Sequence, residues 1–312
     1  MNRVTYEGAW SKVSYSVLSN EQVEQFKERG WVKLAEGFPR EVALACQDLV
    51  WERMKPMGML KDDSSTWTKP MVQINEAYSH DDFQLCNTKR LADAIEDLIG
   101  AGRWAERSVC GETELVATYG WWPVNFALGS DKAWDVPKGG WHWDGQHFRH
   151  YVDSPEQGLL CLCLFSEIGT RGGGTLVAEG SHKIVAKYLS AFPDGTEQGP
   201  AIGAVNRSHP WMAELTGESE ESGDGRSRVE KFMTETIDAE GVRLRVVETT
   251  GSPGDVILCH PFLYHAPSAN HAGTPRFMCN RTTPLKDRME FDRTGNEGYS
   301  PLELSIKEAL SL

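Results

Sequence analysis

The second half of the chain consists of short apolar runs separated by glycine-rich turns. Residues 158–165 are almost continuously apolar, as expected for a strand that is buried on both faces. A turn followed by a strand pattern occurs at 172–177 and again at 254–259, and residues 243–248 add a further strand pattern. Several short strands at this spacing predict a sandwich or a jelly roll.

The first third of the chain has helical patterns instead. Ser19 is followed three residues later by Gln22, which is the sequence of a capping box, and Gly30 marks the end of that helix. Further segments with regular patterns are a strand at 31–34 and helices at 38–50, 91–99 and 301–311. We therefore expect a fold that is mostly β with flanking helices.

The patterns predict one domain over residues 1–312. Its parts are a helical N-terminal part at 1–110, a jelly-roll core at 111–290 and a C-terminal tail or helix at 291–312. The core is expected to contain a strand at 114–119 and an insertion at about 190–240, which is rich in Gly, Ser and Glu. A solvated insertion is the favoured interpretation of 190–240, and a mobile lid is the alternative.

Composition limits the possible partners. The chain has 312 residues and a formal net charge of −13, opposite in sign to that of proteins built to bind phosphate backbones. Nucleic acids and anionic membrane surfaces are therefore not expected partners. The longest apolar run, 159–165, is too short to span a bilayer, and residues 1–10 do not resemble a signal peptide. We expect a cytoplasmic protein whose seven cysteines are free.

His142 and Asp144 form the motif that carries chemistry. They follow a turn at 137–140, in a run where side chains should alternate between two faces. An extended backbone would place both on the same face. Two histidines and one carboxylate on one face of an octahedron form the site of non-haem Fe(II) oxygenases, which leaves three positions open. The motif needs a second histidine later in the chain.

Two histidines follow the strand pattern at 254–259, namely His260 and His265. Their odd spacing would place them on opposite faces of a continuous strand, so at most one of them should bind the metal. Arg276 comes later, and its planar guanidinium can hold a carboxylate through two parallel hydrogen bonds.

Four landmarks resemble the phytanoyl-CoA dioxygenase-like group of Fe(II)/2-oxoglutarate-dependent oxygenases. They are the helix and strand at 18–32, the His-Trp-Asp motif at 142–144, the glycine-rich hairpin at 173–183 and the segment 254–276. Glu179 stands where the hairpin of the family usually has proline. The place two residues after the last ligand, where many relatives carry a hydroxyl, is Pro267, and Ser268 follows it.

The resemblance implies a double-stranded β-helix, which is a cupin-like jelly roll. It implies that His142, Asp144 and His265 bind Fe(II), and its spacing favours His265 over His260. Arg276 would form the salt bridge to the distal carboxylate of 2-oxoglutarate, and Thr175 would be a further contact of that cosubstrate.

The activity that the resemblance implies is that of a dioxygenase, which consumes O2 and 2-oxoglutarate and releases succinate and CO2. Asp144 disfavours halogenation, because related halogenases replace this carboxylate with a small residue. Hydroxylation of a small organic molecule, such as a secondary metabolite, is the expected outcome, with desaturation, epoxidation or ring formation as alternatives. The candidate substrate contacts are Trp121, Trp122, Gln146 and His147.

Two other classes of function fit part of the pattern. Two histidines and an aspartate can also bind Zn²⁺ with an activated water, as in a hydrolase or isomerase. A jelly roll can also bind a ligand without catalysis, because one fold serves many functions. Arg276 behind the third ligand argues against the first class, and the intact ligand set argues against the second. The oligomeric state is left open.

Overall fold

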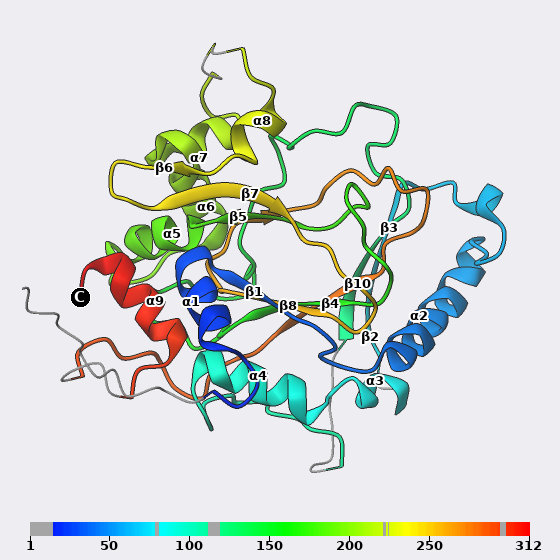
Figure 1. The fold of residues 1–312 in the computed structure, drawn as a ribbon, viewed down its shortest axis with the longest axis horizontal. Coiled ribbons are helices and arrows are strands. Elements are labelled where there is room, and N and C mark those ends of the chain that lie inside the picture. The colour runs from blue at the N-terminus through cyan, green and yellow to red at the C-terminus, as the bar shows by residue number, and fades with distance from the viewer. Residues whose placement is uncertain (1–14, 79–80, 112–118, 221–222, 224, 294–297) are drawn as a thin grey trace, which may run out of the picture.

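The computed structural model describes residues 15–78, 81–111, 119–220, 223, 225–293 and 298–312. Within them, two antiparallel sheets face each other (Figure 1). The larger sheet has the strand order β1-β8-β4-β10-β3-β2, and the smaller sheet has the order β6-β7-β5-β9. The strands are β1 Trp31–Leu34, β2 Met71–Tyr78, β3 Tyr119–Asn125, β4 Leu160–Leu164, β5 Leu176–Glu179, β6 Thr236–Ile237, β7 Arg243–Glu248, β8 Val256–Cys259, β9 His265–Ala266 and β10 Met278–Thr282.

Helices cover the outer sides of both sheets. On the larger sheet, Trp51 of α2 packs on Phe277 with ring centroids 5.2 Å apart, and Phe83 of α3 packs on Trp122 at 5.6 Å. Helices α5 to α8 gather beside the smaller sheet (Figure 1). The helices are α1 Asn20–Arg29, α2 Arg40–Met54, α3 Asp81–Leu85, α4 Lys89–Ile99, α5 Ser181–Ser190, α6 Gln198–Ser208, α7 Pro210–Leu215, α8 Arg228–Phe232 and α9 Pro301–Leu310.

Strand alternation gives the larger sheet an outer face toward the helices and an inner face toward the smaller sheet. The outer-face residues belong to the main hydrophobic core and include Val32, Val72, Trp122, Cys163 and Leu258. The inner-face residues form a second cluster with Val177 of β5 and include Leu160, Leu162, Leu164, Ile257 and Met278. The inner face therefore lines the space between the two sheets.

The first helix begins and ends where its sequence predicts. The Gln22 backbone N–H donates to Ser19 Oγ at 3.2 Å, and the Ser19 N–H donates to Gln22 Oε1 at 2.9 Å. This confirms the predicted capping box. Gly30 ends the helix with φ of 86°, a conformation that favours glycine.

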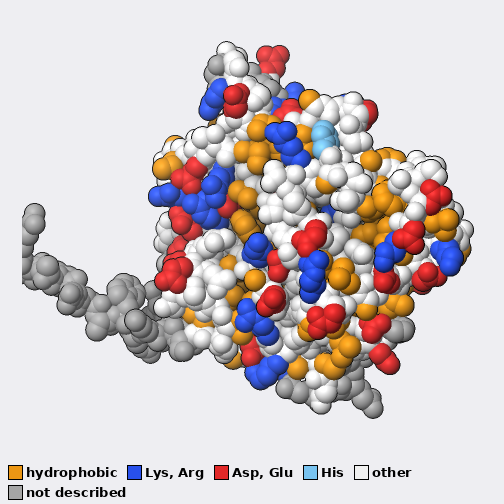
Figure 2. All heavy atoms as spheres, turned by 45° about the vertical axis from the view of Figure 1, so that its right-hand side comes forward, with side chains coloured by type: hydrophobic (Ala, Val, Ile, Leu, Met, Phe, Trp, Pro, Cys, Tyr) orange, Lys and Arg blue, Asp and Glu red, His pale blue; other side chains and the backbone are white. Residues whose placement is uncertain are grey.

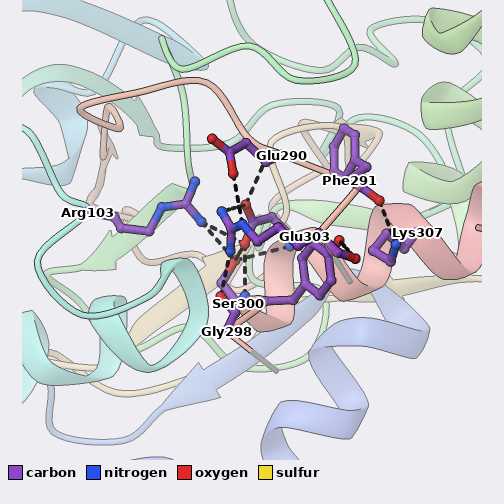
Figure 3. A network of polar contacts seen from close by, with 9 residues as sticks. Arg103, Glu290, Phe291, Gly298, Ser300, Glu303 and Lys307 are labelled. Carbon is purple, nitrogen blue, oxygen red and sulfur yellow. Dashed lines mark hydrogen bonds and ion pairs between the residues drawn. The ribbon is translucent and has the colours of Figure 1, made fainter. Parts of the chain in front are cut away.

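The C-terminal helix α9 is fixed by a buried carboxylate at its start (Figure 3). Glu303 is fully buried and accepts the backbone N–H of Ser300 at 2.9 Å. Arg103 lies 2.7 Å and Arg293 3.2 Å from the same carboxylate. The helix packs against α1, α4 and α5, so the helix predicted at 301–311 closes the N-terminal part of the fold.

The insertion expected at 190–240 contains packed helices as well as exposed segments at 217–220 and 225–227. The helices are α6, α7 and α8, whose apolar side chains Val205 and Phe232 are fully buried. The Gln198 side chain of α6 donates to the backbone carbonyl of Trp143. Polar residues dominate the composition of this segment, but its few apolar ones fall on helix faces that pack inward.

The predicted jelly roll is confirmed by the two facing antiparallel sheets with helices on their outer sides. The sheets do not close into a barrel, and the flanking helices hold more of the described residues than the strands do. The strand expected at 114–119 lies outside the described residues, apart from Tyr119 at the start of β3. Of the helices described, none is long and apolar enough to cross a bilayer.

Candidate metal centre

Backbone pairing brings His142 beside His265. The His142 N–H donates to the carbonyl of His265 at 3.0 Å, and the His265 N–H donates to that of His142 at 2.8 Å. The run around His142 is therefore a single bridge onto β9 rather than a full strand. The two imidazole rings lie with their centroids 4.4 Å apart.

Asp144 completes a triangle with these two rings. Its Oδ1 lies 3.3 Å from Nε2 of His142 and 3.5 Å from Nε2 of His265, and the three ligand atoms all lie within 4.8 Å of one another. Metal–ligand bonds of about 2.1 Å would place neighbouring ligands of an octahedron about 3 Å apart. His265 is buried while His142 and Asp144 are partly exposed, so the triangle lies at the edge of the protein interior.

Hydrogen bonds fix which ring nitrogen faces the carboxylate. Nδ1 of His142 lies 2.8 Å from the carbonyl of Gly140, and Nδ1 of His265 lies 3.1 Å from the carbonyl of Leu263. A carbonyl only accepts, so each Nδ1 carries the proton. Each ring therefore directs Nε2 toward Asp144, as a metal-binding histidine does.

Charge in the triangle is arranged for a cation. Burial opposes ionisation of Asp144, yet the two imidazoles beside it lower the pKa of this carboxyl below its ordinary value. Burial likewise opposes protonation of His142, but Asp144 raises the pKa of this imidazole overall. An ionised carboxylate between two histidines is a site where a divalent cation would replace protons.

Asn280 of β10 holds the other oxygen of the carboxylate. Its Nδ2 donates to Asp144 Oδ2 at 3.3 Å, while Oδ1 faces the two histidines. Asp144 is therefore oriented to offer one oxygen rather than two. A carboxylate that binds through one oxygen uses one metal position and leaves the other positions free.

Arg276 is a buried cation without a carboxylate partner among the described residues. It is 2% exposed, its Nε donates to the carbonyl of Gly173 at 2.9 Å, and its buried Nη1 has no hydrogen-bond partner. Burial lowers the pKa of this guanidinium to about 10, which still leaves it charged at neutral pH. An unpaired buried charge is costly, so this arrangement indicates a site for an anion.

The residue whose carbonyl accepts from Arg276 has to be a glycine because it lies against Asn125 and Asn270. Arg276 pairs with Asn125 through two backbone hydrogen bonds of 2.8 and 3.0 Å. Gly173, whose carbonyl accepts from Arg276, has φ of 77°, and a Cβ there would lie 2.7 Å from Nδ2 of Asn125. Only glycine can take this conformation without a clash.

Arg276 and Asn280, the residue that holds Asp144, lie on the inner face of one extended segment. Arg276, Met278 and Asn280 are two residues apart, so their side chains point to the same side of the extended chain. Asn280 lies four positions after Arg276, which is roughly 13 Å along an extended backbone. The long arginine side chain shortens the gap that a bound molecule would have to span.

The other candidates near the cosubstrate lie as follows. Thr175 is buried and precedes β5, two residues before Val177, which is directly opposite His265 in the register. Ser268 does not fill the place of the missing hydroxyl, because its Oγ donates to the carbonyl of Gly174 at 2.6 Å. The structure brings His265 to the triangle and not His260, which is buried against His182.

The four candidate substrate contacts separate into two groups. Trp122 is fully buried on the outer face, with its ring centroid 4.7 Å from that of Phe165, so the structure does not bring it to the triangle. Trp121 lies on the inner face, opposite Asn280, and is 37% exposed. Gln146 and His147 are exposed in the turn that follows Asp144.

Sequence reasoning missed Asn280, although a signal was present. It lies four residues after Arg276, and a strand with period two places both on one face. The inner-face residues Gln73 and Asn75 of β2 were also missed, since no chemical motif marks them.

The surface drawn in Figure 2 carries acidic and basic side chains that are interspersed, without a broad basic patch. The net charge of −13 is thus not offset on this face by a concentrated positive region.

No protein-family model matches the sequence, and no curated protein matches it either. Solved structures with a similar arrangement include EctD from S. alaskensis with 2-oxoglutarate and 5-hydroxyectoine, at 17% identity over 86% of this chain and 77% of that chain, with a TM-score of 0.44. HygX from Streptomyces hygroscopicus with iron bound has 12% identity over 85% of both chains and a TM-score of 0.46. AviO1 from Streptomyces viridochromogenes Tue57 has 14% identity over 89% of this chain and 99% of that chain, with a TM-score of 0.45. At these identities and TM-scores, none of them assigns a function to this chain.

Proposed function

We propose that the chain is an Fe(II)- and 2-oxoglutarate-dependent dioxygenase of the phytanoyl-CoA dioxygenase-like group that hydroxylates a C–H bond of a small organic molecule. The reaction consumes one O2 and one 2-oxoglutarate for each substrate and yields the alcohol, succinate and CO2. One oxygen atom enters the alcohol, and the other enters succinate.

The observation that carries this proposal is the pairing of two incomplete sites. His142, Asp144 and His265 offer two Nε2 lone pairs and one carboxylate oxygen, a donor set that suits Fe(II) with positions left open. Arg276 offers a buried guanidinium whose Nη1 has no partner. A dicarboxylate such as 2-oxoglutarate would satisfy both sites, with one end at the metal and the other at Arg276.

When bound, Fe(II) with 2-oxoglutarate supplies the oxidising power that activates O2 and attacks the C–H bond. The side chains of this protein supply the geometry. Asp144 and the two histidines orient the open positions, and Asn280 keeps Asp144 turned so that a single oxygen faces the site. Arg276 would hold the far carboxylate of the cosubstrate in a buried environment, where a paired charge is held more strongly than in water.

The substrate would approach from the exposed side of the triangle. Trp121, Gln146 and His147 are available there, and Thr175 is available on the cosubstrate side. Trp122 is not proposed as a contact, because it lies in the helix-side core.

The test is the visible charge-transfer band that an Fe(II)–2-oxoglutarate chelate gives under anaerobic conditions. Purified protein would be reconstituted with both components as wild type, His265→Ala, Arg276→Ala and His260→Ala. We expect the band in the wild type and in His260→Ala. It should be lost in His265→Ala, and it should need a higher 2-oxoglutarate concentration in Arg276→Ala.

The same series separates the oxygenase from the zinc alternative. Absence of the band in wild-type protein that binds Zn²⁺ tightly would overturn the proposal. Loss of the band in His260→Ala, in protein with an unchanged far-ultraviolet circular dichroism spectrum, would show that the ligand set is wrong.

A further inference from the structure

One row of directly opposed residues crosses the inner face of the larger sheet beside the metal centre. Leu162 of β4 pairs with Asn280 of β10, Asn280 pairs with Trp121 of β3, and Trp121 pairs with Asn75 of β2. Residues directly opposite each other point to the same face, so these four side chains form a continuous line.

Exposure changes steadily along this row. Leu162 is buried under the smaller sheet, Asn280 is half-buried, Trp121 is 37% exposed and Asn75 is exposed. Because Asn280 donates to Asp144, the metal centre lies at the boundary between the dry part of the row and its open part. The smaller sheet packs over Leu162, whereas Trp121 of β3 and Asn75 of β2 are exposed in this row.

The proposed cosubstrate would extend along β10 toward Arg276 and not across the strands toward β2. A molecule that joins the triangle to Arg276 runs along β10, above Met278, which is the inner-face residue between Asn280 and Arg276. The cosubstrate therefore does not fill the row toward β2. In the direction of β2, the surface formed by Trp121, Asn75 and, in the next row, Gln73 opposite Pro123 is exposed beside the residue that holds Asp144.

The side chains of Gln73, Asn75, Trp121 and Asn280 are uncharged. Trp121 offers an exposed aromatic face, and Gln73 and Asn75 offer amides that both donate and accept hydrogen bonds. Asn280 Oδ1 is a buried acceptor that has no hydrogen-bond partner. The nearest carboxylate of β2 among the described residues, Glu76, is paired with Arg53 on the helix side.

We infer that this surface, defined by Gln73, Asn75, Trp121 and Asn280, is the substrate subsite, and that its ligand is an uncharged molecule with a ring and hydroxyl groups. The ring lies on Trp121, and the hydroxyl groups exchange hydrogen bonds with the amides. A charged substrate would lose hydration at this surface without gaining an ion pair. This inference rests on the proposed function, because it takes the direction of the cosubstrate from it.

The test uses three probes of the same shape and different charge: phenyl glucoside, phenyl glucuronide and phenyl glucosaminide, all as β-pyranosides. Binding would be measured by saturation-transfer NMR on the Zn²⁺-loaded protein with 2-oxoglutarate, which needs no turnover. We expect the neutral glucoside to bind at least about tenfold more tightly than the anionic and cationic probes. Trp121→Ala and Asn75→Ala should each weaken the glucoside by about tenfold.

Two control variants match the tested residues in exposure and type. Phe192→Ala removes an aromatic ring that is 38% exposed at the end of α5, and Asn20→Ala removes an exposed amide on α1. Both should bind the glucoside as the wild type does. Failure of all three probes, tighter binding of a charged probe, or unchanged glucoside binding in Trp121→Ala would each overturn the inference.

The Fe(II)–2-oxoglutarate band keeps the two proposals apart. It should be unchanged in Trp121→Ala and Asn75→Ala, because neither residue holds the metal or the cosubstrate. If the band is absent in the wild type while the glucoside binds as expected, the proposed function fails and the neutral subsite stands. If the band is present and the glucoside does not bind, the subsite fails alone.

Discussion

Two pairs of neighbouring histidines among the described residues lie in very different surroundings. His142 and His265 have ring centroids 4.4 Å apart, and His182 and His260 have them 4.8 Å apart. The first pair has Asp144 between its Nε2 atoms and partial access to solvent. His182 and His260 are each 1% exposed. Their side-chain hydrogen bonds join them to the backbone of Lys27 and Phe262, and none joins them to a described carboxylate.

The different surroundings shift the pKa of His142 and the pKa values of the second pair in opposite directions. Asp144 raises the pKa of His142 against the effect of burial. For His260, burial lowers the pKa well below its usual value, and His182 and Lys183 lower it further. Two close imidazoles are therefore not sufficient for a metal site. The carboxylate turns one pair into a cation site, and its absence leaves the other as a packing element under α1.

The change with the largest expected effect is Asp144→Ala, which would make the first pair resemble the second. Loss of an outer partner of a metal ligand costs about 10–100-fold in affinity, and loss of the ligand itself should cost more. We expect binding of Ni²⁺, measured by calorimetry, to fall below detection. His147→Ala, which alters an exposed histidine three residues later, should bind as the wild type does. Tight binding by Asp144→Ala would show that the histidine pair alone suffices.

The second pair predicts a loss of stability in acid. Burial, assisted by Lys183, lowers the pKa of His182 to about 3, although the Lys27 carbonyl acts in the opposite direction. Between about pH 6.5 and pH 3 the unfolded chain would bind a proton at this residue that the folded chain does not. The free energy of unfolding should therefore fall with decreasing pH, by at most about 1.4 kcal/mol per pH unit for each such histidine. Urea unfolding at several pH values measures this slope.

Removal of the His182 imidazole tests whether this buried histidine causes the loss of stability in acid. His182→Leu keeps an apolar side chain in the space and removes one titrating group, so its stability should depend less steeply on pH below 6.5. The two proteins are compared by the slope of unfolding free energy against pH and not by absolute stability. His182 packs closely on Gly30, where an added Cβ would lie 2.6 Å from His182 Nδ1, so the substitution also changes the packing there. An unchanged slope would mean that His182 titrates normally in the folded state.

A smaller effect is expected for the residue that orients the carboxylate of the first pair. Asn280→Leu has nearly the same size but no donor for Asp144 Oδ2, so the carboxylate can turn. We expect Ni²⁺ affinity to fall by about 10–100-fold. Thr282→Ala, on the same face of the same strand, is the matched control and should not change the affinity. Equal affinities in both variants would assign Asn280 to packing alone.

Much of the fold could be predicted because local signals and burial agree. The capping box at Ser19, the apolar run at 158–165 and the strand at 243–248 each correspond to an element at nearly the expected position. Residues 190–240 could not be predicted in this way. Their helices are stabilised by contacts with distant segments, such as the Arg228 Nε donor to the Val136 carbonyl at 2.8 Å, which composition does not reveal.

The candidate site divides similarly. His142 and Asp144 are close in sequence, so spacing alone could pair them. The opposite-face rule allowed only one of His260 and His265 to join them, and the family resemblance favoured His265. The residues that surround the triangle on the larger sheet could not be predicted from spacing. The pairing of Asn280 with Trp121, and of Trp121 with Asn75, is a matter of strand register, and a shift by one residue would replace Trp121 with Trp122.

The smallest expected effect concerns Lys183, which lies beside the second pair. Its charge lowers the pKa of both His182 and His260, because a protonated ring there would be repelled. In Lys183→Gln the folded-state pKa values should rise slightly toward those of the unfolded chain, so acid should destabilise the variant less than the wild type. Lys183 is partly exposed, and solvent screening should limit the difference to roughly 0.5 kcal/mol or less at pH 4. Urea midpoints at pH 7 and pH 4 would measure it, and a variant that loses more stability in acid than the wild type would contradict the assignment of Lys183 as a repelling neighbour.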